Sequence, residues 1–538
     1  MFVKKIISLL VIFAMFCLSV STITTASNDV KANEVKVKIN GVEQKYDQPA
    51  IIIKDSTMVP LRGIFEALGA TVEWNEKKQK VTAKKDDINV ELIIGSNKAK
   101  VNNVEKKIDS PPVIINERTL VSARFVSEAL GAIVEWDEAR YTVNIYTIKR
   151  ELLDALRNLD ARFDKSVMDW CISLYDPEEG GYYYAVSARD NEGFAPDIES
   201  TAQMIANMQY MGIITPGNPS DDIMPPEIKE KLVNFMKVRQ DPETGYFYDK
   251  QFGSQVSDSK KGRNLGQAVN VLSRFGEKPL YLTSTERVKN KDDNQNENTE
   301  DVLPAYLQSE EAFLEWLDER PWDTNVYGAG ANLSGIASLI KAAGLWETAV
   351  EYVMDMQNPE TGLWGEGLAY INVNAAMKLR GFFANSEPPI PMPYIDKLIE
   401  SVIYVIKNET PSTAAEVWNP IILLRDAIKS YSGKFPPELK EKIDESMIEI
   451  VNAVAESMDY FRQPDNGYSW SKKGSSAKSQ GVYVSLGEPE GDVNATNLLM
   501  MARRDCYLLV GVEAPPLWDL DRDYFWEKTL NAEPIIKN

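Results

Sequence analysis

Residues 346–379, WETAVEYVMDMQNPETGLWGEGLAYINVNAAMKL, decide the fold of the larger part of this chain. Apolar side chains recur at helical spacing from Ala349 to Met356, which predicts a helix with one apolar face. The segment QNPETG at 357–362 ends that helix, because proline cannot continue a helix and glycine permits a turn. Trp364 follows, and a second helix, rich in small residues, is expected from about Asn372. The stretch therefore predicts two helices joined by a polar turn.

The same succession of helix, turn and small-residue helix recurs across residues 151–530. Turns of this kind are written DPEEGG at 176–181, DPETG at 241–245 and QPDNG at 463–467. Two further helix pairs are expected without the proline turn. Repeated units of this size are typical of an array, and six such pairs predict a closed ring. The helices expected inside the ring are 199–211, 264–275, 332–343, 373–383, 415–429 and 494–510.

The turn carries a resemblance to known families. Gln357, Gly362 and Trp364 resemble the glutamine–tryptophan repeat of the α/α toroids of terpenoid cyclases and prenyltransferases. The ring is also similar to six-hairpin glycosidases and to toroidal polysaccharide lyases. These resemblances imply an all-α (α/α)6 toroid over residues 151–530. Terpenoid cyclisation is disfavoured, because the chain has no Asp-x-Asp-Asp motif.

The beginning of the chain is typical of an exported protein. Lys4 and Lys5 precede an apolar run at 6–20, so residues 1–26 are expected to be a secretory signal peptide. No later apolar run is long enough to cross a bilayer. We therefore expect a secreted, extracellular protein without a transmembrane segment after cleavage of the signal, and association with the cell wall is left open.

Residues 34–147 contain two copies of one unit, at about 34–95 and 96–147. TMVPLR at 57–62 corresponds to TLVSAR at 119–124, and EALGA is repeated at 66–70 and 128–132. Each copy predicts an extended segment, a short helix and an alternating strand. The motif resembles the copper amine oxidase N-terminal-like domain, a stalk module of secreted proteins. It implies a small duplicated α/β domain, in which the repeated Trp74 and Trp136 are expected either as core anchors or as outward-facing rings.

Charge and composition exclude several functions. The chain of 538 residues has no histidine, which excludes a Ser-His-Asp triad, a histidine base and His-ligated copper or zinc. We expect no metal, no cofactor and no copper amine oxidase activity. Residues 151–538 hold 37 basic and 62 acidic side chains, a formal charge of −25. Such a domain disfavours binding of nucleic acid, anionic membranes or polyanionic sugars, with a local basic groove as the alternative.

Two smaller features complete the domain plan. Residues 286–301 are polar and nearly free of apolar side chains, so we expect an excursion between helix pairs. Cys171 and Cys506 are the cysteines left after signal cleavage, and ring closure would make their helix pairs neighbours. They are expected to be buried free thiols, with a disulfide as the alternative.

Loops leading from the outer to the inner helices should open at one end of the ring and hold the candidate site. The carboxylate candidates for catalysis are Asp197, Glu199, Glu366, Glu416 and Asp492. The candidates for substrate binding are Tyr183, Arg189, Trp322, Trp364, Tyr370, Trp418 and Trp470. Hydrolysis of a glycosidic bond needs two carboxyl groups, and aromatic rings stack on sugars. The alternative for Asp197 and Asp492 is capping, because each stands where a helix is expected to begin.

Three functions stay open. The first is hydrolysis of a polysaccharide or cell-wall glycan by a carboxylate pair. The second is a polysaccharide lyase, for which Tyr183, Arg189, Arg263 and Asn264 are the candidates. The third is a glycan-binding or structural module without catalysis. The sequence does not decide between them, and it does not indicate an oligomeric state.

Overall fold

The computed structural model describes residues 35–215, 224–287, 304–431 and 435–537. It divides into one unit up to Thr147, which is rich in β-strands, and a second from Ile148, which is mostly helical. The expected signal peptide at 1–26 lies outside the described residues, as does the polar segment at 286–301 apart from its first two residues. No helix in the described part of the chain combines the length and apolarity that crossing a bilayer requires.

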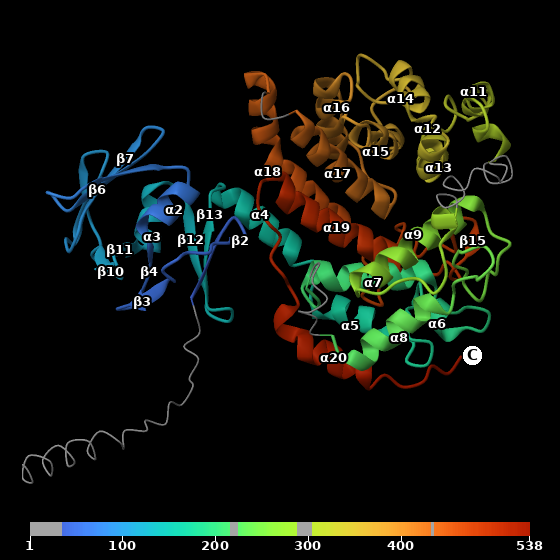
Figure 1. The fold of residues 1–538 in the computed structure, drawn as a ribbon, viewed down its shortest axis with the longest axis horizontal. Helices are drawn as coiled ribbons and strands as arrows, with labels where there is room; N and C mark the ends of the chain where they lie inside the picture. The colour runs from blue at the N-terminus through green and yellow to red at the C-terminus, as the bar shows by residue number, and fades with distance from the viewer. Residues whose placement is uncertain (1–34, 216–223, 288–303, 432–434, 538) are drawn as a thin grey trace, which may run out of the picture. The chain divides into compact units, whose positions relative to one another are not determined.

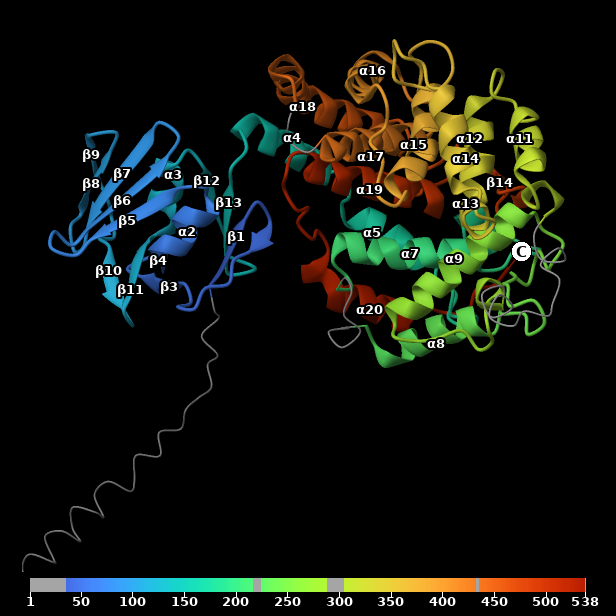
Figure 2. The ribbon, with the colours of Figure 1, turned by 45° about the horizontal axis from the view of Figure 1, so that its top comes forward.

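In its described part, between Val35 and Thr147, the N-terminal unit forms three sheets and two short helices (Figure 2). Its strands are β1 (Lys36–Ile39), β2 (Val42–Glu43), β3 (Ile51–Ile53), β4 (Ser56–Pro60), β5 (Thr71–Asn75), β6 (Lys80–Lys85), β7 (Ile88–Ile93), β8 (Lys98–Val101), β9 (Val104–Lys107), β10 (Val113–Ile115), β11 (Arg118–Ser122), β12 (Ile133–Asp137) and β13 (Thr142–Tyr146). The helices are α2 (Leu61–Ala67) and α3 (Ala123–Ala129), each followed by a glycine with positive φ, Gly69 or Gly131.

The two copies of the repeat interlock instead of folding separately. The sheet orders are β12-β13-β1-β2, β10-β11-β4-β3 and β5-β6-β7-β8-β9, so every sheet takes strands from both copies. At the centre of the second sheet Val59 pairs with Val121, the equivalent residue of the other copy. Trp74 and Trp136 are 41% and 40% exposed, so neither is a core anchor. The shared sheets make one hydrophobic core for the whole unit.

The second unit is built mainly from helices, which Figure 1 labels. They are α4 (Arg150–Asp160), α5 (Lys165–Ser173), α6 (Val186–Asp190), α7 (Ile198–Met211), α8 (Pro226–Lys237), α9 (Asp258–Arg274), α11 (Glu310–Asp318), α12 (Val326–Gly335), α13 (Ala337–Ala342), α14 (Trp346–Asp355), α15 (Tyr370–Ala384), α16 (Ile395–Asn408), α17 (Ala414–Ser430), α18 (Pro437–Asp459), α19 (Val493–Leu509) and α20 (Arg522–Leu530). A two-stranded hairpin, β14 (Lys478–Ser479) and β15 (Val482–Tyr483), precedes α19.

Six of these helices contact one another in succession. The helix α7 contacts α9, α9 contacts α12, α12 contacts α15, α15 contacts α17, and α17 contacts α19. The helix α19 in turn contacts α7. The helices α8, α14 and α16 contact α9, α15 and α17, the helices that follow them in the succession (Figures 1 and 2).

The structure corrects the bounds of two helices expected inside the ring. The third was predicted at 332–343, but α12 begins at Val326 and ends before Ile336, where the separate helix α13 begins. Asn325 caps α12 by accepting a hydrogen bond from the Gly328 amide at 2.9 Å. Gly330 permits close packing of α12 on α15. The second helix was predicted from 264, but α9 begins at Asp258.

The turn at 357–362 has the conformation that its sequence predicts. Gln357 donates its side-chain amide to the carbonyl of Gly362 at 2.7 Å, and Gly362 has a φ of +68°. A Cβ atom at this glycine would lie 2.4 Å from the backbone nitrogen of Leu398. The turn therefore packs directly against α16 and leaves no room for a side chain.

Replacing Gly362 with alanine is expected to lower the free energy of unfolding by about 2 kcal/mol, because positive φ and backbone overlap both oppose the new methyl group. Gly344→Ala is the matched control, since Gly344 has a φ of +72° and nothing within 4 Å of the added Cβ. It should cost about 1 kcal/mol. Urea unfolding of the two variants measures the difference, and equal losses would show that the close packing at Gly362 contributes nothing.

Cys171 and Cys506 are both fully buried and both free, so the alternative of a disulfide is not realised. Burial raises the pKa of each thiol. They fill core space in α5 and α19, as expected of apolar cysteines.

Candidate functional site

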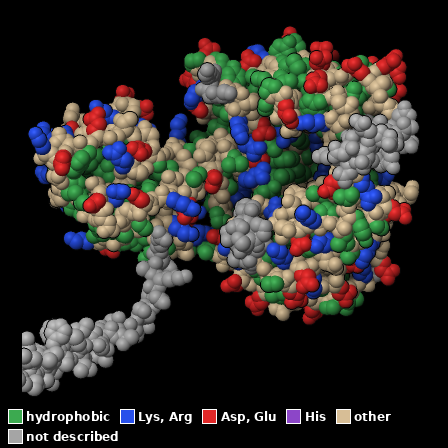
Figure 3. Space-filling view, in the orientation of Figure 1, with side chains coloured by type: hydrophobic (Ala, Val, Ile, Leu, Met, Phe, Trp, Pro, Cys, Tyr) green, Lys and Arg blue, Asp and Glu red, His purple; other side chains and the backbone are tan. Residues whose placement is uncertain are grey.

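All six helices of the succession line one cavity of about 510 Å³. In the space-filling view this face of the helical unit is hollowed, and Lys and Arg side chains gather beside the hollow (Figure 3). The aromatic residues in its wall are Tyr210, Tyr327, Trp418 and Trp470. The amides in its wall are Gln203, Gln267, Asn270, Asn419, Gln480, Asn494 and Asn497. The volume is in the range of small-molecule binding sites.

The cavity is cationic although the helical unit is strongly acidic. Its basic residues are Arg263, Arg274, Lys378 and Arg380, and no aspartate or glutamate is among the described residues that line it. Residues 151–538 carry 62 acidic side chains against 37 basic ones. The local basic groove, which the net charge left open as an alternative, is therefore present. Its low-dielectric walls strengthen the positive field inside.

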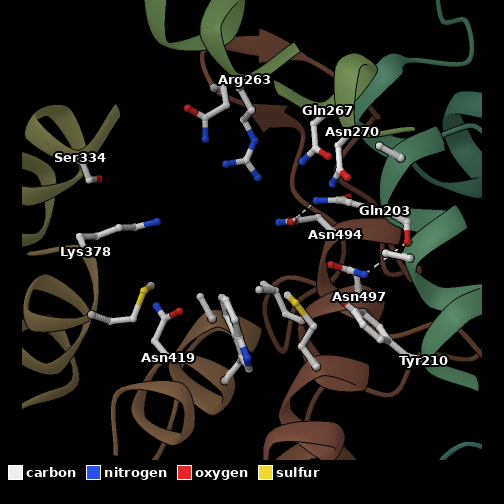
Figure 4. Close-up of a pocket in the computed structure, with 18 of the residues that line it drawn as sticks. Gln203, Tyr210, Arg263, Gln267, Asn270, Ser334, Lys378, Asn419, Asn494 and Asn497 are labelled. Carbon is white, nitrogen blue, oxygen red and sulfur yellow. Dashed lines mark hydrogen bonds between the residues drawn. The ribbon is translucent and has the colours of Figure 1, made fainter. Parts of the chain in front are cut away.

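Arg263 is held in place by Glu199. Its Nε lies 2.5 Å from Glu199 Oε1, and the guanidinium points into the cavity (Figure 4). The side chain of Glu199 is 5% exposed and also pairs with Lys260, at 3.2 Å. Burial acts to raise the pKa of Glu199, but Arg263 and Lys260 together hold it below its usual value. The two cations therefore favour the ionised form of Glu199, and its carboxylate orients Arg263 in the cavity.

Lys378 enters the cavity from α15 (Figure 4). Within the described residues it makes no hydrogen bond or ion pair, and its Nζ lies 5.8 Å from the centre of the Tyr327 ring. Burial lowers the pKa of Lys378 to about 8, and the positive charges of Arg263 and Arg380 add to this effect. Arg380, in contrast, has a counter-ion, because its Nε lies 3.0 Å from Asp426.

A chain of amides forms the wall between α7 and α19. Gln203 donates to the side-chain oxygen of Asn494 at 2.9 Å, and Asn497 donates to that of Asn207 at 2.7 Å. The side-chain oxygen of Gln203 is buried and has no hydrogen-bond partner in the part of the chain that the structure describes. Such a polar atom favours a ligand that supplies a donor, such as a sugar hydroxyl.

The aromatic wall is fixed by a buried carboxylate. Trp418 donates its indole N–H to Asp505 at 2.8 Å, and Arg425 donates to the same carboxylate at 2.5 Å. Asp505 is fully buried in α19. With its nitrogen held, the Trp418 ring has a fixed orientation at the cavity, which is what stacking on a sugar ring requires.

Asp197 and Asp492 serve as helix caps. Asp197 accepts from the Ser200 amide at 2.8 Å at the start of α7, and Asp492 accepts from the Ala495 amide at 2.7 Å at the start of α19. Burial, with the neighbouring carboxylate of Asp249, raises the pKa of Asp197 to about 6. Burial raises the pKa of Asp492 to about 7. They are 2% and 0% exposed, and neither lines the cavity.

Three of the five carboxylate candidates lie near one another. Burial raises the pKa of Tyr184, and the negative charges of Asp492, Glu199 and Asp197 raise it further, so all three act on that phenol. The first and the last loop meet here, since Ala185 forms a β-bridge with Asp492. All three carboxylates are buried.

The other two carboxylate candidates lie elsewhere. Glu366 is exposed, and its backbone carbonyl accepts a hydrogen bond from the Asn372 side chain at 2.7 Å. Glu416 closes a capping box at the start of α17, where it accepts from the Ser412 amide at 2.6 Å. Neither forms a hydrogen bond with the buried group around Tyr184 among the described residues.

Of the seven candidates for substrate binding, Trp418 and Trp470 line the cavity. The others have structural partners. Trp322 donates to Leu317, Trp364 donates to Val353, Tyr183 donates to Asp176, Tyr370 donates to Glu409, and Arg189 pairs with Asp190. Of the lyase candidates, Arg263 lines the cavity, whereas Asn264 is buried and donates to Asp249 at 3.0 Å.

Most residues that line the cavity lie on the inner helices, whereas the candidates predicted from the sequence lie mainly in loops. Arg263, Gln267, Asn270 and Arg274 recur at helical spacing in α9, and all four line the cavity. A polar stripe on a helix expected to lie inside a ring is the signal that would have found them. Lys378 does not belong to such a polar stripe, so this signal would not have found it. Among the described residues, no group of three or more acidic or cysteine side chains is placed to hold a metal ion.

Comparisons with known proteins bear mainly on the N-terminal unit. Residues 38–145 match the family described as Copper amine oxidase N-terminal domain. A protein of Brevibacillus choshinensis named "Protease inhibitor" is 30% identical over 132 residues, which are 24% of this chain and 39% of that protein. The chain thus matches less than half of that relative.

One solved structure, described as "Crystal structure of a protein from Actinoplanes", covers 66% of this chain and 99% of its own. It is 14% identical with a TM-score of 0.34, a level that does not establish a common fold.

Proposed function

We propose that this is a secreted protein in which a stalk-type N-terminal domain carries an (α/α)6 toroid that binds an acidic polysaccharide. The signal-like segment at 1–26 supports secretion. The succession of contacts from α7 through α19 and back to α7 supports the toroid. The cavity that these six helices line is the proposed binding site.

The observation that carries the proposal is the composition of the cavity wall. Arginines bind carboxylates through paired hydrogen bonds, and Arg263 and Lys378 point into the cavity (Figure 4). The amides of α7 and α19 supply partners for hydroxyl groups, and Trp418 and Trp470 supply flat apolar faces. An acidic sugar, such as a uronic acid, presents all three kinds of group.

The composition of the cavity wall also bears on two of the functions that the sequence left open, hydrolysis and glycan binding. Hydrolysis needs two carboxyl groups beside the scissile bond, and the described cavity lining supplies none. Binding of an acidic glycan needs only the cations, amides and rings described above. The cavity lining therefore supports binding of an acidic glycan better than it supports hydrolysis by a carboxylate pair. The positive charge inside the cavity acts on a ligand there more strongly than the net negative charge of the helical unit.

Lys378→Gln tests the proposal, because among the described residues this lysine has no counter-ion that the substitution would leave unpaired. The variant is expected to bind a uronic-acid oligosaccharide about tenfold more weakly, the value of one charged hydrogen bond. Calorimetric titration of the mature protein measures the change. Lys429→Gln is the matched control, since Lys429 is exposed at the end of α17. Unchanged affinity in Lys378→Gln, or an equal loss in both variants, would contradict the proposal.

A further inference from the structure

Lys378 differs from two of the other cations of the cavity in having no counter-ion. Arg263 pairs with Glu199, and Arg380 pairs with Asp426. Lys378 makes no ion pair or hydrogen bond within the described residues, yet its side chain extends into the cavity toward Asn494 (Figure 4). Lys378 is partly exposed at the cavity, and a cation that the fold leaves without a counter-ion gains no ion-pair stabilisation there. Its position is therefore better explained by a ligand.

The two arginines near Lys378 favour the neutral form of its side chain. Arg263 faces it from α9 and Arg380 lies on its own helix, with Asp426 of α17 as the counter-ion of Arg380. Tyr327 faces it from α12, and Glu416 at the start of α17 acts on that tyrosine. Burial and the two arginines lower the pKa of Lys378 to about 8, so a sizeable fraction is free amine in mildly alkaline solution. A free amine is a proton acceptor.

We propose that Lys378 is the proton acceptor of a β-elimination, so that the toroid cleaves a uronic-acid polysaccharide as well as binding it. This inference rests on the proposed function, because it requires an acidic glycan in the same cavity. Arg263, held by Glu199, binds the uronate carboxylate and stabilises the negative charge that develops beside it. Lys378 approaches from a different helix and takes the proton next to that carboxylate.

The elimination is balanced without any co-reactant. The amine of Lys378 takes the proton from C5 of the uronate, and the C–H electron pair forms the C4–C5 double bond as the bond from C4 to the glycosidic oxygen breaks. That oxygen leaves with the neighbouring sugar and receives a proton from water, which creates a new reducing end. The ammonium of Lys378 then returns its proton to solvent. The products are an unsaturated uronate and a shortened chain.

The residues present favour lysine for this role. The chain contains no histidine. Burial raises the pKa of Tyr327, which keeps the phenol protonated near neutral pH. Burial lowers the pKa of Lys378 to about 8, so of these two cavity residues the lysine is the better proton acceptor.

Lys378→Arg separates proton transfer from binding, because arginine keeps the positive charge but does not lose its proton in proteins. With an unmethylated polyuronate as substrate, the wild type is expected to release products that absorb in the ultraviolet. Its kcat/KM should rise with pH to a plateau above about pH 8, where the lysine is neutral. Lys378→Arg should bind within about threefold of the wild type but turn over at least 100-fold more slowly. Lys429→Arg is the control and should match the wild type.

The outcomes distinguish this inference from the proposed function. A wild type that binds the polyuronate without forming unsaturated products would overturn the elimination and leave the binding proposal standing. Turnover retained in Lys378→Arg would overturn the role of Lys378. A wild type that does not bind the polyuronate would overturn both.

Discussion

Lys260→Met is expected to lower the free energy of unfolding by about 3–5 kcal/mol at pH 8, the usual cost of removing one partner from a buried ion pair. Lys260 is fully buried and lies 3.2 Å from Glu199. Its charge also holds down the pKa values of Asp197 and Asp249, both of which burial raises. Without the Lys260 ammonium, the buried carboxyl groups of Glu199, Asp197 and Asp249 would lose a positive charge that stabilises their ionised forms.

The loss in Lys260→Met should depend on pH in a defined direction. Removing the ammonium raises the folded-state pKa values of Asp197 and Asp249 further above their unfolded values. Such groups bind more protons in the folded state, so stability falls as the pH rises. The deficit relative to the wild type should therefore be smaller at pH 5 than at pH 8, as urea unfolding at both values would show.

Lys261→Met is the matched control for this prediction. Lys261 is the next residue of α9, with a side chain 27% exposed and a partner, Asp258, 76% exposed. An exposed pair of this kind contributes less than about 1 kcal/mol. If Lys260→Met cost no more than Lys261→Met, the cluster around Glu199 would not be a stabilising network.

Asp492→Asn is expected to flatten the dependence of stability on pH between about 4 and 7. Burial raises the pKa of Asp492 to about 7 from a model-compound value of 3.8. In that interval the folded state holds a proton that the unfolded state releases, so the wild type loses stability as the pH rises through it. Asparagine does not titrate, and the variant should therefore lose this part of the slope.

Asp492→Ala should lose the same part of the slope, because alanine does not titrate either. It should also be about 1–3 kcal/mol less stable than Asp492→Asn at every pH, because alanine supplies no acceptor for two backbone amides. Those amides belong to Ala495 and Trp470, which donate to the carboxylate at 2.7 and 2.6 Å. Thermal melts of both variants across the pH range are the measurement. A slope for Asp492→Asn equal to that of the wild type would show that Asp492 does not titrate there.

The helix pairs were predictable because their turns are determined locally. At 357–362 the proline, the glycine with positive φ and the Gln357 side chain act within six residues, and the turn forms as predicted. The repeat in residues 34–147 was equally visible. The exchange of strands between its copies was not, because a strand's partner across 62 residues depends on which edges remain unpaired after folding.

The candidate site was harder to predict, for a physical reason. Loop carboxylates such as Asp197 have two uses, as caps and as acids, and the sequence of a helix start is the same for both. Burial decides between them, and burial is a property of the whole fold. Lys378 shows the converse, since an isolated lysine on a helix is ordinarily a solvated residue and only the six-helix surroundings place it in a cavity.

The central claim is that the cationic cavity recognises the carboxylates of an acidic glycan. Its most direct test is titration of the mature protein with a uronic-acid oligosaccharide and with the same oligosaccharide after its carboxyl groups have been reduced to alcohols. The two ligands differ only in the groups that Arg263 and Lys378 are proposed to bind. The account predicts at least about tenfold tighter binding of the acidic ligand. Equal affinity for both ligands, or binding of neither, would contradict it.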